Sequence, residues 1–121
     1  MVRDGGFAGL MIEGSAADIA SVGRNFVPAL VRPFVRLRVD PALARFDYLA
    51  YATASKLPVL LLSSSEDAIV KDRNMRAFAD QLRARGTDVT FVSIPGWHGT
   101  ALREPKALAA VKAFVSQRSS R

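Results

Sequence analysis

The stretch that decides the fold is LPVLLLSSSEDAIV, from Leu57 to Val70. Its first seven residues form an apolar run entered through a proline, a pattern typical of a strand that is buried on both faces of a parallel sheet. Serines and acidic residues follow at once, which indicates a loop that leaves the strand. This stretch therefore predicts a central strand whose exit loop carries Asp67.

Two further apolar runs flank this stretch along the chain. FAGLMI (Phe7–Ile12) is bounded by glycines and predicts a second buried strand, and DVTFVSI (Asp88–Ile94) predicts a third. Helical patterns separate the three runs, and strands that alternate with helices imply crossovers in a parallel sheet. The sequence therefore predicts an α/β fold with a three-stranded parallel sheet and flanking helices.

Three helical patterns accompany these strands. Ser15 resembles the N-cap of a first helix. Asp72 is expected to cap a second helix, which Gly86 ends, and Pro105 suits the first turn of a third. The apolar residues expected to face the sheet are, helix by helix, Ile19, Val22 and Phe26; Met75, Phe78, Ala79 and Leu82; and Leu108, Val111 and Val115.

The rest of the chain is less regular. Three prolines break the stretch from Val27 to Pro41, so residues 27–54 are expected to form a cap-like or irregular helical segment. The polar end SQRSSR, residues 116–121, is expected to fray. Because the sequence has no internal repeat and no low-complexity linker, residues 1–121 are interpreted as a single domain.

The composition excludes several kinds of chemistry. The 121 residues include one histidine and no cysteine. A disulfide, a thiolate zinc site and a cysteine nucleophile are therefore excluded. The sequence also lacks a glycine-rich phosphate-binding loop. We therefore predict neither a metal nor a cofactor.

The chain is basic, with 17 Lys and Arg against 11 Asp and Glu and a net charge of +6. Its densest positive group, Arg32 to Arg38, is interleaved with Pro and Val rather than with aromatic residues, which disfavours nucleic-acid binding. No apolar run is long enough to span a membrane, and no signal peptide is visible. We expect a cytoplasmic protein without a membrane partner.

Polar side chains follow each of the predicted strands, namely Glu13, Asp67 and His98. The carboxyl ends of neighbouring parallel strands meet at one edge of a sheet. Asp67 and His98 could therefore hydrogen-bond, with the carboxylate fixing the tautomer of the imidazole. Glu13 is an alternative acid but fits better as a polar residue that ends a strand. Trp97, beside His98, is expected to wall a pocket or to pack against the last helix.

Together these segments resemble the carboxyl-terminal half of the α/β-hydrolase fold, strands six to eight, in its serine esterase, lipase and aminopeptidase-like branch. LPVLLLSSSEDAIV is similar to strand seven and the loop with the catalytic acid, and VSIPGWHGT to the segment with the catalytic base after strand eight. FAGLMIEGS resembles strand six. The resemblance implies that Asp67 is the acid and His98 the base of a Ser-His-Asp hydrolase. Such an enzyme cleaves ester or amide bonds of a small substrate through an acyl-enzyme.

The G-x-S-x-G nucleophile elbow of that family is missing from this sequence. Ser15, which follows the first predicted strand, has Glu13 and Ala17 where the motif has glycines, and no other serine has glycine at both positions. Ser15 is better explained as an N-cap than as a nucleophile. The loop that helps to form the oxyanion hole is absent too. We therefore expect a truncated hydrolase that has no nucleophile and is inactive alone.

A non-catalytic role is the alternative. Without strand five beside it, Phe7–Ile12 would form an apolar sheet edge with unpaired backbone groups. Such an edge is expected to pair with a second copy of the chain or with a complementary fragment. Under this alternative the chain is an interaction or oligomerisation module derived from a hydrolase.

Overall fold

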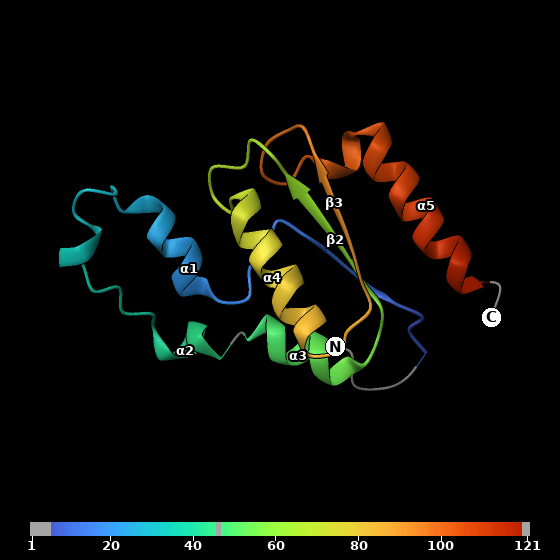
Figure 1. The fold of residues 1–121 in the computed structure, drawn as a ribbon, viewed down its shortest axis with the longest axis horizontal. Helices are drawn as coiled ribbons and strands as arrows, with labels where there is room; N and C mark the ends of the chain where they lie inside the picture. Colours follow the sequence, from blue (N-terminus) through green and yellow to red (C-terminus); the bar gives the residue numbers. More distant parts are fainter. Residues whose placement is uncertain (1–5, 46, 120–121) are drawn as a thin grey trace.

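The computed structural model describes residues 6–45 and 47–119, and its centre is a parallel sheet (Figure 1). The strands are β1 (Leu10–Glu13), β2 (Val59–Ser64) and β3 (Val89–Ile94), and they lie in the order β1-β2-β3. The helices are α1 (Ile19–Gly23), η1 (Arg24–Phe26), η2 (Arg32–Phe34), α2 (Pro41–Ala44), α3 (Tyr48–Ser55), α4 (Asp72–Ala84), η3 (Ala101–Arg103) and α5 (Pro105–Ser119). This arrangement confirms the predicted α/β fold with three parallel strands.

Strand β2 is the centre of the hydrophobic core, as its apolar run predicted. All six of its residues are buried. Val59 and Leu61 pack with α3 and α4 on one face, whereas Leu60 and Leu62 pack with α5 on the other, so the two longest helices lie on opposite sides of the strands (Figure 1). Burying one such leucine stabilises the fold by about 1.5–3 kcal/mol.

Helix α4 follows the predicted pattern, but its N-terminus does not. The four predicted core residues, Met75, Phe78, Ala79 and Leu82, are all buried. Gly86, at φ +81°, follows the helix end as expected. The N-cap is Lys71 rather than Asp72, which is the first helical residue. The Asp72 carboxylate instead accepts hydrogen bonds from the hydroxyls of Ser63 and Ser93.

Helix α1 begins later than predicted. Its N-cap is Asp18, whose Oδ1 accepts a hydrogen bond from the backbone N–H of Ser21 at 2.7 Å, so the prediction that Ser15 is the cap is wrong. The physical reason is burial: Ala16 and Ala17 enter the core in non-helical chain before the helix can start. Phe26, predicted to face the sheet, lies in η1 and is 66% exposed.

Helix α5 begins at Pro105 as predicted, but of its three predicted inward residues only Val111 packs against the core. Ala107 and Phe114 are buried, whereas Leu108 and Val115, which were predicted to face inward, are exposed. The helix also continues to Ser119, although fraying was predicted from residue 116. The Arg118 guanidinium lies 3.6 Å from the centre of the Phe114 ring and donates to the Phe114 carbonyl, which holds the last turn. Residues 120–121 lie outside the described residues.

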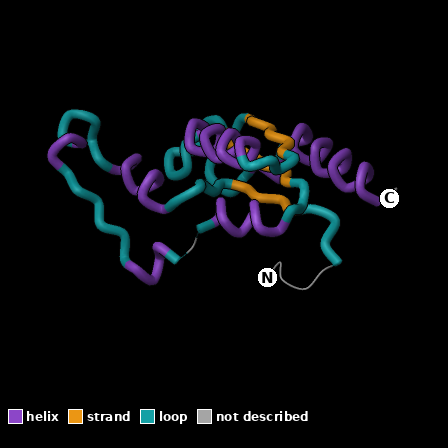
Figure 2. The backbone as a smooth tube through the Cα atoms, turned by 60° about the horizontal axis from the view of Figure 1, so that its bottom comes forward, coloured by secondary structure: helices purple, strands orange, loops and turns teal. Residues whose placement is uncertain are grey.

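Strand β1 is an edge of the sheet rather than a buried strand. Among the described residues it pairs only with β2, and Phe7 and Met11 are exposed. From α1 to α2 the chain extends away from the sheet in short helices and loops (Figure 2). Within residues 6–45 and 47–119, no helix has both the length and the apolar character that a membrane crossing needs.

Candidate acid–base site

Asp67 is fixed by its own loop, directly after β2. The side chain is almost completely buried. Its Oδ1 accepts hydrogen bonds from the backbone N–H groups of Ile69 and Val70, both at 2.8 Å. An aspartate that binds backbone N–H groups two and three residues ahead is a common way to close a turn. Because Oδ1 is occupied in this way, Oδ2 is the oxygen that remains for a partner.

That partner is His98, whose Nδ1 lies 2.7 Å from Asp67 Oδ2. The two residues were predicted to be neighbours from their places after adjacent strands, and this proximity is confirmed. An ionised carboxylate can only accept hydrogen bonds, so Nδ1 carries the proton and donates it. In the neutral ring Nε2 is then a free base. Within the described part of the chain, Nε2 makes no hydrogen bond, and the side chain is 40% exposed.

Two backbone hydrogen bonds join the loops that carry these residues. The N–H of Ser65 donates to the carbonyl of Ile94 at 2.8 Å, and the N–H of Glu66 donates to the carbonyl of Gly96 at 3.1 Å. Gly96 has φ +126°, a conformation that side-chain-bearing residues rarely adopt. The loop after β3 can therefore turn back towards the loop after β2 and bring His98 onto Asp67.

Gly14 is a third component, which the sequence did not predict. It follows β1 at φ +55° and lies against the imidazole. A Cβ built at this position would lie 3.0 Å from His98 Cε1 and 3.8 Å from Asp67 Oδ2. The only signal in the sequence was a glycine directly after a predicted strand, which by itself indicates no more than a turn.

Glu13 does not contact the imidazole. Its Oε1 accepts a hydrogen bond from the backbone N–H of Ala101 at 2.8 Å, which satisfies a free donor at the start of η3. The interpretation of Glu13 as a polar residue that ends a strand is therefore supported over an acid role beside His98. Its bond also ties the end of β1 to the chain that follows His98.

Trp97 is largely exposed, which supports neither of its predicted positions. The residue is 69% exposed, and it is absent from the residues that line the two hollows described below. Its backbone N–H donates to Thr100 Oγ1 at 2.9 Å, and the Thr100 hydroxyl donates in turn to the Trp97 carbonyl. Trp97 thus helps to form the His98 loop through its backbone, while its indole ring points into solvent.

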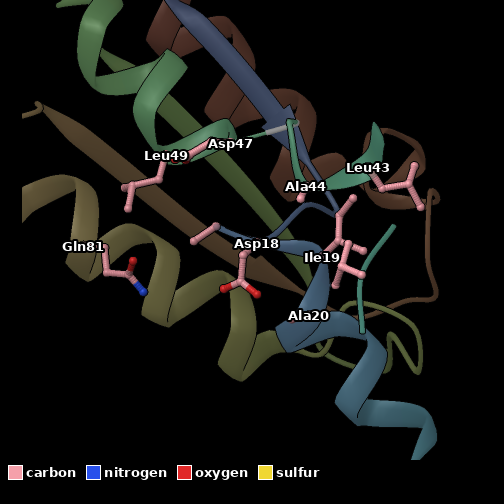
Figure 3. A pocket seen from close by; sticks show the side chains of 10 residues that line it. Asp18, Ile19, Ala20, Leu43, Ala44, Asp47, Leu49 and Gln81 are labelled. Carbon is pink, nitrogen blue, oxygen red and sulfur yellow. The ribbon is translucent and has the colours of Figure 1, made fainter. Parts of the chain in front are cut away.

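A hollow of about 300 Å³ lies away from this pair, and Figure 3 shows its lining. It is formed by Ala17, Asp18, Ile19, Ala20, Val39, Leu43, Ala44, Asp47, Leu49 and Gln81. Its two carboxylates, Asp18 and Asp47, already bind the backbone N–H groups of Ser21 and Ala50 at the starts of α1 and α3. Neither residue of the acid–base pair lines it, so this hollow is not part of the candidate site.

The arrangement at Asp67 and His98 can move a proton at one atom. A substrate, water or hydroxyl group that reaches Nε2 can lose its proton to the ring, and Asp67 then stabilises the imidazolium. Within residues 6–45 and 47–119, no serine or threonine hydroxyl forms a hydrogen bond with His98. The described residues therefore bring a carboxylate and an imidazole within hydrogen-bond distance of each other, and among them no serine or threonine hydroxyl is bonded to the imidazole.

Comparison with solved structures shows likeness to α/β-hydrolases. The chain is similar to the uncomplexed acylaminoacyl peptidase of Pyrococcus horikoshii, at 20% identity and a TM-score of 0.65 over 95% of this chain and 20% of that one. It is also similar to an acylaminoacyl peptidase in complex with Z-Gly-Gly-Phe-chloromethyl ketone, at 18% identity and a TM-score of 0.66 over 99% of this chain and 21% of that one. A carboxylesterase from Lactobacillus plantarum matches at 16% identity and a TM-score of 0.54, over 86% of this chain and 36% of that one.

Neither a protein-family model nor a curated protein matches the chain. The structural likeness nevertheless confirms the fold that the sequence resembled: this chain has the fold of part of an α/β-hydrolase. It spans about a fifth of the length of the acylaminoacyl peptidases that it matches.

Proposed function

We propose that Asp67 and His98 are the acid and the base of a Ser-His-Asp hydrolase that cleaves ester or amide bonds through an acyl-enzyme. One observation carries this proposal: the 2.7 Å hydrogen bond between the buried Asp67 carboxylate and Nδ1 of the sole histidine. The fold supports it, because the structural neighbours are named as peptidases and a carboxylesterase. The substrate class that we infer is accordingly an amide or an ester.

In this mechanism His98 Nε2 takes the proton of a serine hydroxyl as the serine oxygen attacks the carbonyl carbon of the substrate. Asp67 holds the ring through Nδ1–H and stabilises the positive charge that the ring acquires. The same proton then passes from Nε2 to the leaving alcohol or amine when the acyl-enzyme forms. A water molecule then gives a proton to Nε2 as its oxygen attacks the acyl carbon. The bond from that carbon to the serine oxygen breaks, and Nε2 returns the proton to the serine.

The serine and the oxyanion donors of this reaction would come from polypeptide outside this sequence, which contains no nucleophile elbow. Loss of a single oxyanion donor costs about 2.7–4 kcal/mol of transition-state stabilisation. With both the nucleophile and the donors missing, the chain alone forms no acyl-enzyme. A serine-directed fluorophosphonate should accordingly leave the mass of the purified chain unchanged.

The proposal is tested by a fusion in which this chain replaces the segment of the Pyrococcus horikoshii acylaminoacyl peptidase with which it superposes. On our proposal the rest of that peptidase supplies the serine. We expect the folded fusion to be labelled by a fluorophosphonate and to hydrolyse an activated ester, and His98→Ala to abolish both. Asp80→Asn, at an exposed carboxylate on α4, is the matched control and should leave both unchanged. A folded fusion that is neither labelled nor active would contradict the proposal.

A second candidate function is a non-catalytic interaction module. Strand β1 favours it, because Met11 on this sheet edge is 51% exposed. A hollow of about 190 Å³ lies beside the edge, lined by Ala8, Gly9, Met11, Phe114, Val115, Arg118 and Ser119. Sedimentation of the chain with and without Met11→Lys tests this function. An assembly that Met11→Lys dissociates and His98→Ala leaves intact would support it, and a monomer at all concentrations would count against it.

A further inference from the structure

The carboxylate of Asp72 connects two neighbouring strands of the sheet. The hydroxyl of Ser63, in β2, donates to Asp72 Oδ1 at 2.6 Å, and the hydroxyl of Ser93, in β3, donates to the same oxygen at 2.7 Å. Ser63 and Ser93 are register partners in the pairing of the two strands. One oxygen atom at the start of α4 therefore ties together adjacent positions on β2 and β3.

This connection lies close to the point where both halves of the acid–base pair leave the sheet. Ser63 precedes Asp67 by four residues, and Ser93 precedes His98 by five. The loop of residues 65–71, which holds Asp67, is continuous with β2 at its start. At its end, the side chain of Asp72 fastens it to both strands. The loop is thus held at its two ends.

Both oxygens of the Asp72 carboxylate accept hydrogen bonds from side chains. Its Oδ2 accepts a hydrogen bond from Arg76 Nε at 2.6 Å, and the Arg76 guanidinium lies 5.0 Å from the centre of the Phe91 ring of β3. Ser63 is fully buried, so its hydroxyl needs an acceptor inside the protein. The Asp72 carboxylate is that acceptor.

A helix-capping role does not explain the arrangement. An aspartate that caps a helix accepts hydrogen bonds from backbone N–H groups of the first turn. Helix α4 has no side-chain cap, and all the acceptor bonds of Asp72 go to side chains, two of them on the strands. Through Oδ1 the carboxylate therefore links the two strands, in addition to the bond that its Oδ2 makes with Arg76 of its own helix.

We propose that Asp72 is a positioning residue for the Asp67–His98 pair: by holding the exits of β2 and β3 at a fixed separation, it sets the Nδ1–Oδ2 hydrogen bond. This inference rests on the proposed function for the catalytic meaning of that bond. The positioning itself is measurable without a substrate, because His98 is the only imidazole in the chain and gives an unambiguous NMR signal.

The experiment compares the imidazole signals of the full chain with those of Asp72→Ala. Exchange of the Nδ1 proton with water reports how firmly the bond to Asp67 is held, and the two ¹⁵N shifts report the tautomer. We expect Asp72→Ala to speed this exchange at least about tenfold, as for a weakened hydrogen bond to a charged group, and to mix the tautomers. Asp80→Asn removes an exposed carboxylate from the same helix and should change neither signal.

Two further variants keep the test decisive if Asp72→Ala does not fold. Asp72→Asn keeps the shape of the side chain but removes its charge, and the double variant Ser63→Ala with Ser93→Ala removes the two donors instead. Both are expected to speed the exchange in the same direction. If the backbone spectrum of the sheet is kept and the exchange rate and tautomer are those of the unmodified chain, the positioning role is wrong.

The outcome also separates this inference from the proposed function. Faster exchange in Asp72→Ala, together with a folded fusion protein that does not hydrolyse esters, would uphold the positioning role and overturn the hydrolase. A fusion protein that hydrolyses esters equally well with and without Asp72→Ala would uphold the hydrolase function and overturn the positioning role.

Discussion

Gly14 packs so near His98 that no side chain fits between them: a Cβ built on Gly14 would lie 3.0 Å from Cε1 of the imidazole and 3.2 Å from Nδ1. The backbone that leaves β1 therefore forms one wall of the space that the ring occupies. All three strands contribute to the site, since β2 leads to Asp67 and β3 to His98. Such convergence at the carboxyl ends of parallel strands is where functional groups gather in open α/β sheets.

We expect Gly14→Ala to displace the imidazole from Asp67. The new methyl group would press on the ring, and the φ of +55° would itself cost an alanine about 1–2 kcal/mol. Gly86→Ala is the matched control, because Gly86 also has a positive φ but a Cβ added there would meet nothing within 4 Å. Urea unfolding should show similar losses of stability for both, whereas the Nδ1 proton should exchange faster only in Gly14→Ala. Equal exchange rates in the two variants would show that the contact does not hold the ring.

Replacing Asp67 should separate its two roles. Asp67→Ala leaves the N–H groups of Ile69 and Val70 without their acceptor, at a cost of at least about 2 kcal/mol in urea unfolding. Asp67→Asn keeps Oδ1 for those groups but presents an N–H donor to Nδ1, which forces the proton to Nε2. In the active fusion protein this wrong tautomer should lower kcat by about 10⁴.

The neighbouring Glu66→Ala is the control for both Asp67 variants, since Glu66 is exposed. It should change neither the stability nor the tautomer. A fusion that keeps its full activity with Asp67→Asn would remove Asp67 from the mechanism.

The stability contributed by Asp72 should depend on pH. Burial raises the pKa of this carboxyl, but hydrogen bonds from Ser63, Ser93 and Arg76, with the charge of Arg76, outweigh it and leave the pKa below the ordinary 3.8. A pKa that is lower in the folded state means that the contribution is fully present above 3.8 and is lost as the pH falls through the folded value.

Urea unfolding of the chain and of Asp72→Asn measures this dependence. The stability difference between them should be constant from about pH 7 to about pH 5 and should shrink as the pH falls towards about 2. A difference that stays the same down to the lowest pH would contradict the lowered pKa of Asp72.

The register of α5 gives a prediction for the core. Phe114 is buried and Val115 is about half exposed. We expect Phe114→Ala to lower the free energy of unfolding by about 3–5 kcal/mol. Val115→Ala should stay close to the roughly 0.5 kcal/mol of surface substitutions. The opposite order would favour the stripe predicted from the sequence over the observed one.

The sheet could be predicted because its signal is local. The run from Val59 to Leu62 is apolar at every position, so the prediction did not depend on deciding which face is buried. A strand of a parallel sheet, which is buried on both faces, has this pattern. Helix α4 has a single clear stripe. Helix α5 is rich in alanine, so two stripes that share Val111 fit its pattern, and packing of the large Phe114 side chain selects between them.

The start of α1 and the surroundings of the acid–base pair depended on tertiary contacts. Ser15 and Asp18 are both good capping residues. Because Ala16 and Ala17 are buried ahead of the helix, Asp18 is the one that caps α1. The proximity of Asp67 to His98 followed from strand order. The bridge at Asp72 could not be predicted, because a local pattern gives an aspartate at a helix start only the role of a cap.

The central claim is that Asp67 holds His98 as a base with a free Nε2, and ¹⁵N NMR of the neutral imidazole in the unmodified chain tests it most directly. We predict that Nδ1 carries a proton in slow exchange with water and that Nε2 is unprotonated. We also predict that Asp67→Asn moves the proton to Nε2. A ring that already carries its proton on Nε2 in the unmodified chain, or one whose Nδ1 proton exchanges as freely as in the urea-unfolded protein, would contradict this claim.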